Sequence, residues 1–399
     1  MILLKILLVW YTVTGVLLFF YAWREIVAAW REPVLKRPVL IIESDDWGAG
    51  PTEQATAIQQ ISCILEKFSD RDQRRPVMTL GMILAAADGE KTLSSGYYHR
   101  QQISTSSHGQ LLEAIKSGVE AGVFSIQLHG MEHYWPPALL QASKTDKAAM
   151  DWLRHAPHLS TEELPSALQS RWVDASILPS RHLNANAVQL AAQEEVVTFQ
   201  QIFGTIPRVA VPPTFIWTED VEKAWAVAGI SVVITPGNRF ESRDESGSPA
   251  GKGRAIHNGQ SSENNIVYLV RDDYFEPSLG HTAVQALGRL SAKTRLGRPI
   301  LYETHRFNFL GSKEEKNKAL EEIERLLTLA LKQYPDLAFL SSIKLATILK
   351  TRDPAWLEPW SRRRVHIWIS RLGELQRLRK LSCLTGWIVP VGLLWRLTK

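Results

Sequence analysis

The stretch Val39-Leu40-Ile41-Ile42-Glu43-Ser44-Asp45-Asp46-Trp47-Gly48 decides how the chain is interpreted. Its four leading apolar residues predict a buried strand, and two adjacent carboxylates and a glycine turn follow. Because neighbouring strand residues point to opposite faces, Asp45 and Asp46 can share a site only where the strand ends and the backbone turns. Gly48 and Gly50 permit such a turn. Two buried acids need a positive partner, such as a divalent metal; the simpler interpretation is a solvated acidic turn.

The composition is that of a globular protein with an uneven distribution of charge. The 399 residues are 45% hydrophobic and carry a net charge of +5, enough chain for one large domain or two ordinary ones. The only cysteines, Cys63 and Cys383, lie far apart, which excludes a disulfide framework and a cysteine metal site. Nucleic-acid binding is not expected, because the basic residues cluster beside an apolar tail.

The N-terminus contains an uncharged run from Ile6 to Trp23, which is 18 residues and just long enough to cross a membrane. A cleaved signal peptide is the alternative, but no small-residue cleavage site follows the run. We therefore expect an uncleaved anchor. Basic residues are more numerous after the run than before it, which favours a cytoplasmic C-terminal domain.

The region from Pro38 onward alternates between short apolar strands and helical periods, which predicts parallel βαβ units. Seven or eight repeats suggest a (β/α) barrel more than an open sheet, with the active face at the C-terminal ends of the strands. The strands are expected at 38–44, 77–84, 123–128, 208–211, 230–234, 266–271, 299–303 and 337–341, and the helices at 53–68, 107–121, 184–202, 218–228, 281–290 and 313–333.

The tail from residue 351 differs from the rest of the chain. Basic residues surround an apolar stripe that includes Val365, Trp368 and Leu372, and this spacing is helical. A basic amphipathic helix is typical of an anionic membrane surface, although a helix packed on the domain would show the same pattern. The apolar run from Leu384 to Trp395 is short and contains Pro390, so we expect it to dip into the interface or re-enter rather than span.

A second strand ends in a polar cluster at His129-Gly130-Met131-Glu132-His133. On a helical turn, positions i and i+4 lie on one face, so both imidazoles would reach one ion. The order differs from that of the zinc protease motif, in which a glutamate follows the first histidine directly. Two surface histidines with no ligand are the simpler alternative.

Three further strands are bounded by residues that could take part in catalysis or in substrate binding. Arg208 begins a strand that stops at Pro212-Pro213. Taken alone, this stretch indicates only a structural role, the end of a strand. Asp272 and Asp273 follow another strand, and either could orient a histidine. The strand from Ile300 ends at His305. In chain order, the strand ends therefore carry Asp-Asp, His-x-x-x-His, Arg…Pro-Pro, Arg-Asp-Asp and His.

This order resembles the NodB-type polysaccharide deacetylases of carbohydrate esterase family four, as a divergent relative over roughly residues 38–345. The family motif Thr-Phe-Asp-Asp-Gly is similar to 43–48, with tryptophan inserted before the glycine. The motif His-Ser/Thr-x-x-His is similar to 129–133, with glycine for the hydroxyl residue. The arginine and proline motif is similar to 208–213, and Leu-x-His is approximated by 302–305.

The resemblance implies a role for each matching residue. Asp46, His129 and His133 would bind a divalent metal, most often Zn²⁺. Asp45 would be the general base and His305 the acid that protonates the leaving amine. Supporting roles would fall to Arg208, which would orient Asp45 or bind substrate, and to Asp272 or Asp273 beside His305. The expected substrate-binding residues, by aromatic type and motif adjacency or as a rigid wall, are Trp47, Tyr134, Trp135, Pro212 and Pro213.

The resulting prediction is a distorted (β/α)7-8 barrel with an N-terminal transmembrane helix and a basic amphipathic C-terminal tail. It would be a metal-dependent N-deacetylase at the cell's inner membrane, acting on an amino sugar in a polysaccharide, glycan or lipid-linked saccharide and contacting membrane lipids. The alternatives are a hydrolase of another amide or a glycosidic bond, and a degenerate barrel that binds glycan or scaffolds a membrane complex. The expected domains are an anchor at 1–24, a linker at 25–37, a barrel at 38–350 with an insertion at 134–182, and a tail at 351–399.

Overall fold

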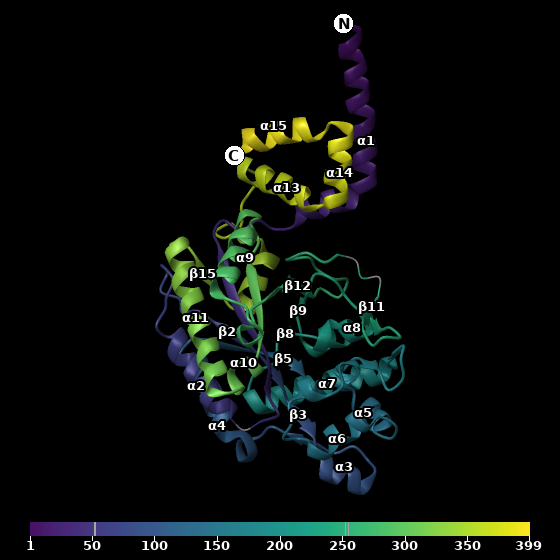
Figure 1. The fold of residues 1–399 in the computed structure, drawn as a ribbon, viewed down its shortest axis with the longest axis vertical. Helices are drawn as coiled ribbons and strands as arrows, with labels where there is room; N and C mark the ends of the chain where they lie inside the picture. Colours follow the sequence, from purple (N-terminus) through teal and green to yellow (C-terminus); the bar gives the residue numbers. More distant parts are fainter. Residues whose placement is uncertain (52, 252, 254) are drawn as a thin grey trace.

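The computed structural model describes residues 1–51, 53–251, 253 and 255–399, and its centre is a parallel β/α barrel (Figure 1). All eight predicted strands are present. Together with a ninth strand, β13, they form a sheet in the order β12-β9-β8-β5-β2-β1-β14-β13, in which β15 also pairs with β1. The strands are β1 (Val39–Gly48), β2 (Met78–Ile83), β5 (Phe124–Gly130), β8 (Val209–Ala210), β9 (Val232–Thr235), β12 (Val267–Val270), β13 (Asp273–Tyr274), β14 (Ile300–His305) and β15 (Ala338–Phe339).

The barrel is open along one seam. Strands follow one another around it in chain order, and β14 returns to pair with β1 in parallel. The two ends of this path, β12 and β13, are separated along the chain only by Arg271 and Asp272. Within the described ranges no strand pairing joins β12 to β13, so the barrel is distorted, as expected, and the distortion is an open seam that the sequence does not predict.

The β1 strand separates two apolar cores because its residues alternate between its faces. Leu40 and Ile42 pack with the outer helices, whereas Val39 and Ile41 pack with apolar residues of the other strands inside the barrel. The outer helices are α2 (Gln54–Leu65), α4 (Thr105–Glu120), α7 (Ala185–Phe203), α8 (Glu219–Ala228), α9 (Ala283–Arg295) and α11 (Lys313–Gln333), and α12 (Ser342–Thr351) contacts β12.

The segments that follow the C-terminal ends of β2 and β5 lie at the end of the barrel farthest from the chain termini (Figure 1). They form a third apolar cluster around Tyr134, Leu139 and Trp152. This cluster combines the region predicted as an insertion, 134–182, with the segment that follows β2. Its elements are β3 (Ala85–Ala87), β4 (Arg100–Gln102), α3 (Gly89–Ser95), α5 (Pro136–Ala142), α6 (Lys147–His155), the 3₁₀ turns at Thr161–Glu163 and Ser166–Leu168, β6 (Val173–Asp174) and β7 (Arg181–His182).

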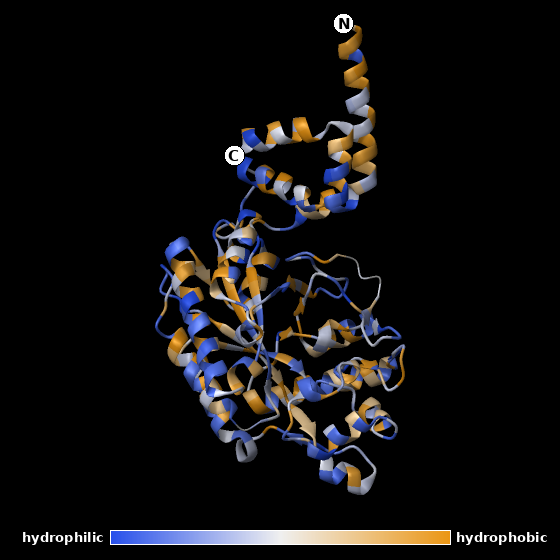
Figure 2. Ribbon diagram, viewed as in Figure 1, coloured by the Kyte–Doolittle hydropathy of each residue, from blue (hydrophilic) through white to orange (hydrophobic). Residues whose placement is uncertain are grey.

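The opposite end of the barrel carries the N-terminal helix and the tail. Helix α1 (Ile2–Arg31) is long and apolar enough to cross a membrane, and Figure 2 shows its apolar surface extending beyond the rest of the molecule. The tail forms α13 (Arg362–Glu374), α14 (Gln376–Thr385) and α15 (Ile388–Thr398), which bend back beside α1 (Figure 1). The buried Arg371 joins them to the end of α1 by donating to the carbonyl oxygens of Ala29, Glu32 and Pro33, and to the barrel by donating to that of Leu296 after α9.

Candidate metal centre and acid-base pair

A bulge in β1 brings two adjacent carboxylates to one site. Alternation from Val39 and Ile41 directs Glu43 and Asp45 into the barrel, and Asp46 would then point outward. The pairing of β1 with β2 shifts by a residue between Ser44 and Trp47, and Asp46 has a φ of +73°. The turn that the sequence requires is thus a bulge within the strand, because β1 continues to Gly48. Such strained backbone is common at functional sites.

Asp46 faces two histidines from β5 and the bend that follows it. Its Oδ1 lies 3.3 Å from Nε2 of His129 and 3.5 Å from Nε2 of His133, and the two rings are 4.9 Å apart. All three side chains are buried. The histidines come from a strand end and a bend rather than from the helical turn we expected. The three predicted metal ligands nevertheless converge.

The donor set fits a divalent cation. Asp46 Oδ1 is buried without a hydrogen-bond partner, a costly state for a carboxylate that a cation between these atoms would relieve. Nδ1 of His129 lies 2.9 Å from the Val211 carbonyl oxygen and donates to it, which directs the lone pair of Nε2 toward Asp46. Burial lowers the pKa of His133 to about 4 against the opposing charge of Asp46, so this imidazole is neutral and able to bind a metal.

Buried ion pairs hold the His-x-x-x-His bend in place. Glu132, between the two histidines, turns away from the site and accepts from Arg171 at 2.6 Å and from Arg100 at 2.8 Å. Arg171 also pairs with Glu195, whose carboxylate accepts from the Met131 backbone N–H. Glu132 therefore supports the bend and is not a base at the candidate metal site.

Asp45 pairs with Arg271 rather than with the predicted Arg208. The Arg271 guanidinium lies 2.5 Å from Asp45 Oδ2, 2.9 Å from Glu43 and 3.3 Å from Glu303, with all four side chains buried. Burial raises the pKa of Asp45, but the charge of Arg271 outweighs it and lowers that pKa, which keeps the carboxylate ionised. Arg208 is exposed at the beginning of β8, the end away from the site, so the structure does not bring it to Asp45.

His305 is oriented by Glu276, which the sequence reasoning missed. Nδ1 of His305 lies 2.6 Å from Glu276 Oε1. Burial lowers the pKa of His305, but the hydrogen bond to Glu276 and the nearby carboxylates outweigh it and raise the pKa to about 10. Asp272 and Asp273 instead pair with Lys293, at 2.5 and 3.4 Å, and so do not take the expected position. No motif marks Glu276, which lies in a connection three residues after Asp273.

Two of the three aromatic residues expected to bind substrate, Trp47 and Tyr134, are buried. Trp47 is fully buried, donates from Nε1 to Ser44 and stacks on Phe309, while Tyr134 is buried against Trp152. Neither ring is available to a sugar face. The third expected aromatic residue, Trp135, is half-buried.

The Pro212-Pro213 pair is buried and leads into a short turn. Phe215 in this turn has a φ of +56°, and its ring lies 5.3 Å from the Arg271 guanidinium. The two prolines therefore help to form the wall beside Arg271, and they are not placed as a direct sugar contact.

A further carboxylate reaches the site from the insertion. Glu162 lies near enough to Asp46 for the two acids to interact, and burial followed by the charge of Asp46 raises the pKa of Glu162 to about 7. Arg306 lies 3.8 Å from Glu162 and donates to the Ala49 carbonyl oxygen, which ties this loop to β1. Glu162 has no motif of its own, and only the fold reveals it.

Comparisons with known proteins give weak structural matches only. No family model and no curated protein matches the chain. A crystal structure named for a polysaccharide deacetylase from Mycobacterium smegmatis is 12% identical, covering 79% of this chain and 91% of that one, with a TM-score of 0.41. A family 4 acetyl xylan esterase from Clostridium thermocellum, in complex with a cobalt ion, is 12% identical (78% and 91% covered, TM-score 0.38). A 4-alpha-glucanotransferase from Thermococcus litoralis is 8% identical (86% and 48%, TM-score 0.42). The first two names belong to the group that the motifs resemble, but similarities this weak say nothing about the activity of this chain.

Proposed function

We propose that this chain is a divalent-metal-dependent hydrolase that removes an N-acyl group, most simply acetyl, from an amino sugar in a saccharide. The observation that supports this proposal best is the convergence of Asp46, His129 and His133, with Asp45 next to Asp46 on β1 and His305 on the adjacent strand β14. Two imidazoles and one carboxylate suit Zn²⁺ and leave coordination positions open. The same donors hold Fe(II) in other proteins, but a neighbouring base and acid favour hydrolysis.

The residues around the site can perform the proton transfers of amide hydrolysis. A bound divalent ion would supply Lewis acidity and lower the pKa of water. Asp45 is ionised, and its Oδ1 has no hydrogen-bond partner, so this oxygen is free to accept a proton from water. His305 is held in its protonated form by Glu276 and is suited to protonate the departing amine. The base and the acid are paired across adjacent strands, because Asp45 is the register partner of His305.

The N-terminal helix supports an anchor that is retained. Trp10 on α1 donates to the carbonyl oxygen of Thr385, and Trp387 donates to Thr14, so the tail packs on the helix that a signal peptidase would remove. The apolar surface of α1 is otherwise mostly exposed, as a lipid-facing helix requires. We propose a single-pass protein of the cell's inner membrane, with the barrel on the cytoplasmic side.

The position of the site favours a saccharide chain over a sugar joined directly to a lipid. The N-terminal end of β1 lies beside the tail helices, and Asp46 lies seven residues further along the strand, about 23 Å away at 3.3 Å per residue. The loops around the C-terminal strand ends lie at the far end of the barrel (Figure 1). A substrate must therefore extend from the membrane surface or be soluble.

Metal removal tests the proposal directly. We expect dialysis against a chelator to abolish acetate release from a soluble N-acetylated oligosaccharide, and Zn²⁺ to restore it, because Asp46 and the two histidines would lose the ion that they share. Undiminished release after verified metal loss would rule the proposal out. Release of sugar fragments instead of acetate would indicate a glycosidase. A protein purified without any metal, and inactive with added metal, would indicate a degenerate barrel.

Changing Asp45 to asparagine separates the base from the metal ligands. We expect Asp45→Asn to retain the ion and to lose roughly 10²- to 10⁴-fold in turnover, the usual contribution of a general base. The variant keeps the shape of the side chain, so the space between Asp45 and Gly81 is unchanged. Metal content and acetate release measured on one preparation test this prediction, and the base assignment fails if Asp45→Asn turns over at the wild-type rate.

A further inference from the structure

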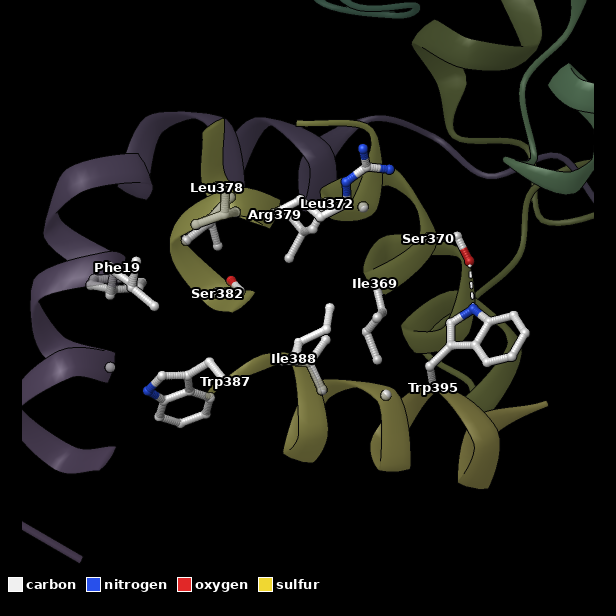
Figure 3. Close-up of a pocket in the computed structure, with 16 residues that line it drawn as sticks. Phe19, Ile369, Ser370, Leu372, Leu378, Arg379, Ser382, Trp387, Ile388 and Trp395 are labelled. Atoms are coloured by element: carbon white, nitrogen blue, oxygen red, sulfur yellow. Dashed lines mark hydrogen bonds between the residues drawn. The ribbon is translucent and has the colours of Figure 1, made fainter. Parts of the chain in front are cut away.

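Helix α1 and the three tail helices surround an apolar cavity at the end of the molecule away from the candidate metal site (Figure 3). Its volume is about 360 Å³. An apolar cavity of ~150 Å³ takes one benzene ring, so this one has room for a longer hydrocarbon segment. Each of the four helices contributes to the wall, with Phe19, Ile369, Leu372, Leu378, Ile388 and Trp395 among the lining residues.

The cavity lies at the depth of the apolar run of α1. The turn between α14 and α15 meets α1 at Trp10, Thr14 and Gly15, in the middle of the uncharged run 6–23. The approach is close at Gly15, because a Cβ at this position would lie 2.5 Å from the Trp387 ring and would displace it. Helices α14 and α15 are bent by 112° to each other, as in a re-entrant segment. If α1 crosses a membrane, the walls of the cavity therefore lie in the hydrocarbon layer and its interface.

The charged side chains of α14 and α15 have one sign. Between Glu374 and Lys399 the sequence has no acidic residue, whereas α14 carries Arg377, Arg379 and Lys380, all exposed. Arg379 also lines the cavity. The ion pairs of the tail with the rest of the molecule are made instead by residues of α13, such as Arg371 with Glu32. Among the described residues none pairs with these three side chains, so they are open to anionic lipid headgroups at a membrane surface.

We propose that this cavity binds one acyl chain of an anionic membrane phospholipid, with the lipid phosphate at Arg379. The apolar lining accepts the chain, and the unpaired basic residues of α14 select the headgroup. Such a lipid would join α14 and α15 to α1 and so fix the height of the barrel above the membrane. The proposal rests on the tail and α1 alone and is independent of the hydrolase activity.

The lining glycines make a sharp test possible. Gly392 of α15 lines the cavity, and a Cβ there would have no heavy atom within 4 Å, so Gly392→Phe adds an aromatic ring at the wall of the cavity without a backbone clash. Gly288 of α9 is an exposed helical glycine with equally open surroundings and gives the matched control, Gly288→Phe. The full-length protein is placed in phosphatidylcholine vesicles that contain a phosphatidylglycerol carrying a photoreactive group in its acyl chain, and the labelled peptides are mapped.

For the wild type and for Gly288→Phe, we expect labelling of α13 and α15 within residues 369–395. Gly392→Phe should reduce it about tenfold, which corresponds to ~1.4 kcal/mol. Arg379→Gln should reduce the preference for phosphatidylglycerol over an equally reactive phosphatidylcholine about fivefold, the factor for ~1 kcal/mol per basic residue near an anionic surface. Three results would overturn the proposal: equal labelling of Gly392→Phe and wild type, equal labelling by the two lipids in the wild type, or crosslinks to a second copy of the chain in place of lipid.

Discussion

Replacing His129 by alanine is expected to abolish retention of the divalent ion and to bring acetate release close to the uncatalysed rate, a fall on the order of 10⁶-fold. His129 is the ligand whose orientation is fixed most firmly, since Nδ1 donates to the Val211 carbonyl oxygen and Nε2 faces Asp46. Losing it removes one of three donors and leaves the buried Asp46 carboxylate with His133 alone. Metal content and acetate release on the same sample are the measurements.

The matched control for this prediction is His182→Ala, because His182 is exposed and lies outside the site. It should keep the ion and the wild-type rate. His129→Ala also leaves the buried Val211 carbonyl oxygen without the histidine donor, which costs about 1–3 kcal/mol. A thermal melt therefore has to show that the variant is folded at the assay temperature. A folded His129→Ala protein that binds the ion at wild-type stoichiometry would contradict the assignment of the metal site.

Much of the barrel is predictable because each strand and helix has a strong local pattern. Buried parallel strands such as β1 are short apolar runs, and the outer helices carry amphipathic periods, so the expected strands and helices agree with the structure within a few residues at most ends. The brief β13 is missed because two residues, Asp273 and Tyr274, carry no apolar pattern. The open seam beside it depends on pairing between distant segments, which no local pattern records.

The site was only partly predictable, because some of its residues follow a local pattern and others are brought in from distant segments of the chain. Asp46 and the two histidines follow apolar strands directly, and position after a strand is a local signal. The partners of Asp45 and His305 are not marked in this way: Arg271 lies at the seam, and Glu276 lies in a connection. The motif resemblance assigned the arginine to position 208, at the wrong end of its strand. The burial of Trp47 is also invisible in the sequence, because the bulge that turns Asp46 toward the site directs Trp47 into the outer core.

Arg271 is the residue on which the interior of the barrel depends most. It follows β12 at the seam, and its single positive charge contacts Glu43, Asp45 and Glu303. Arg271→Met should destabilise the protein by about 3–5 kcal/mol, since removing one partner of a buried ion pair leaves charges buried without compensation. Activity should fall as well, because Asp45 loses the group that holds its carboxylate in place and ionised. Chemical denaturation with a fluorescence readout measures the change in the free energy of unfolding.

Two comparisons separate this effect from simple loss of packing. Arg289→Met removes a half-exposed arginine 3.9 Å from Asp273 and should cost less than about 0.5 kcal/mol. Adding Glu43→Gln and Glu303→Gln to Arg271→Met should restore part of the lost stability, because fewer buried negative charges remain.

The buried carboxylates around Arg271 also predict how stability changes with pH. Burial already raises the pKa of Glu303 to about 7 in the wild type, so this carboxyl binds more protons in the folded state than in the unfolded state, and its contribution to stability is lost as pH rises from about 5 to about 8. Removing Arg271 raises the carboxyl pKa values further and should steepen this fall. If Arg271→Met is as stable as Arg289→Met throughout this range, the guanidinium does not hold the three carboxylates together.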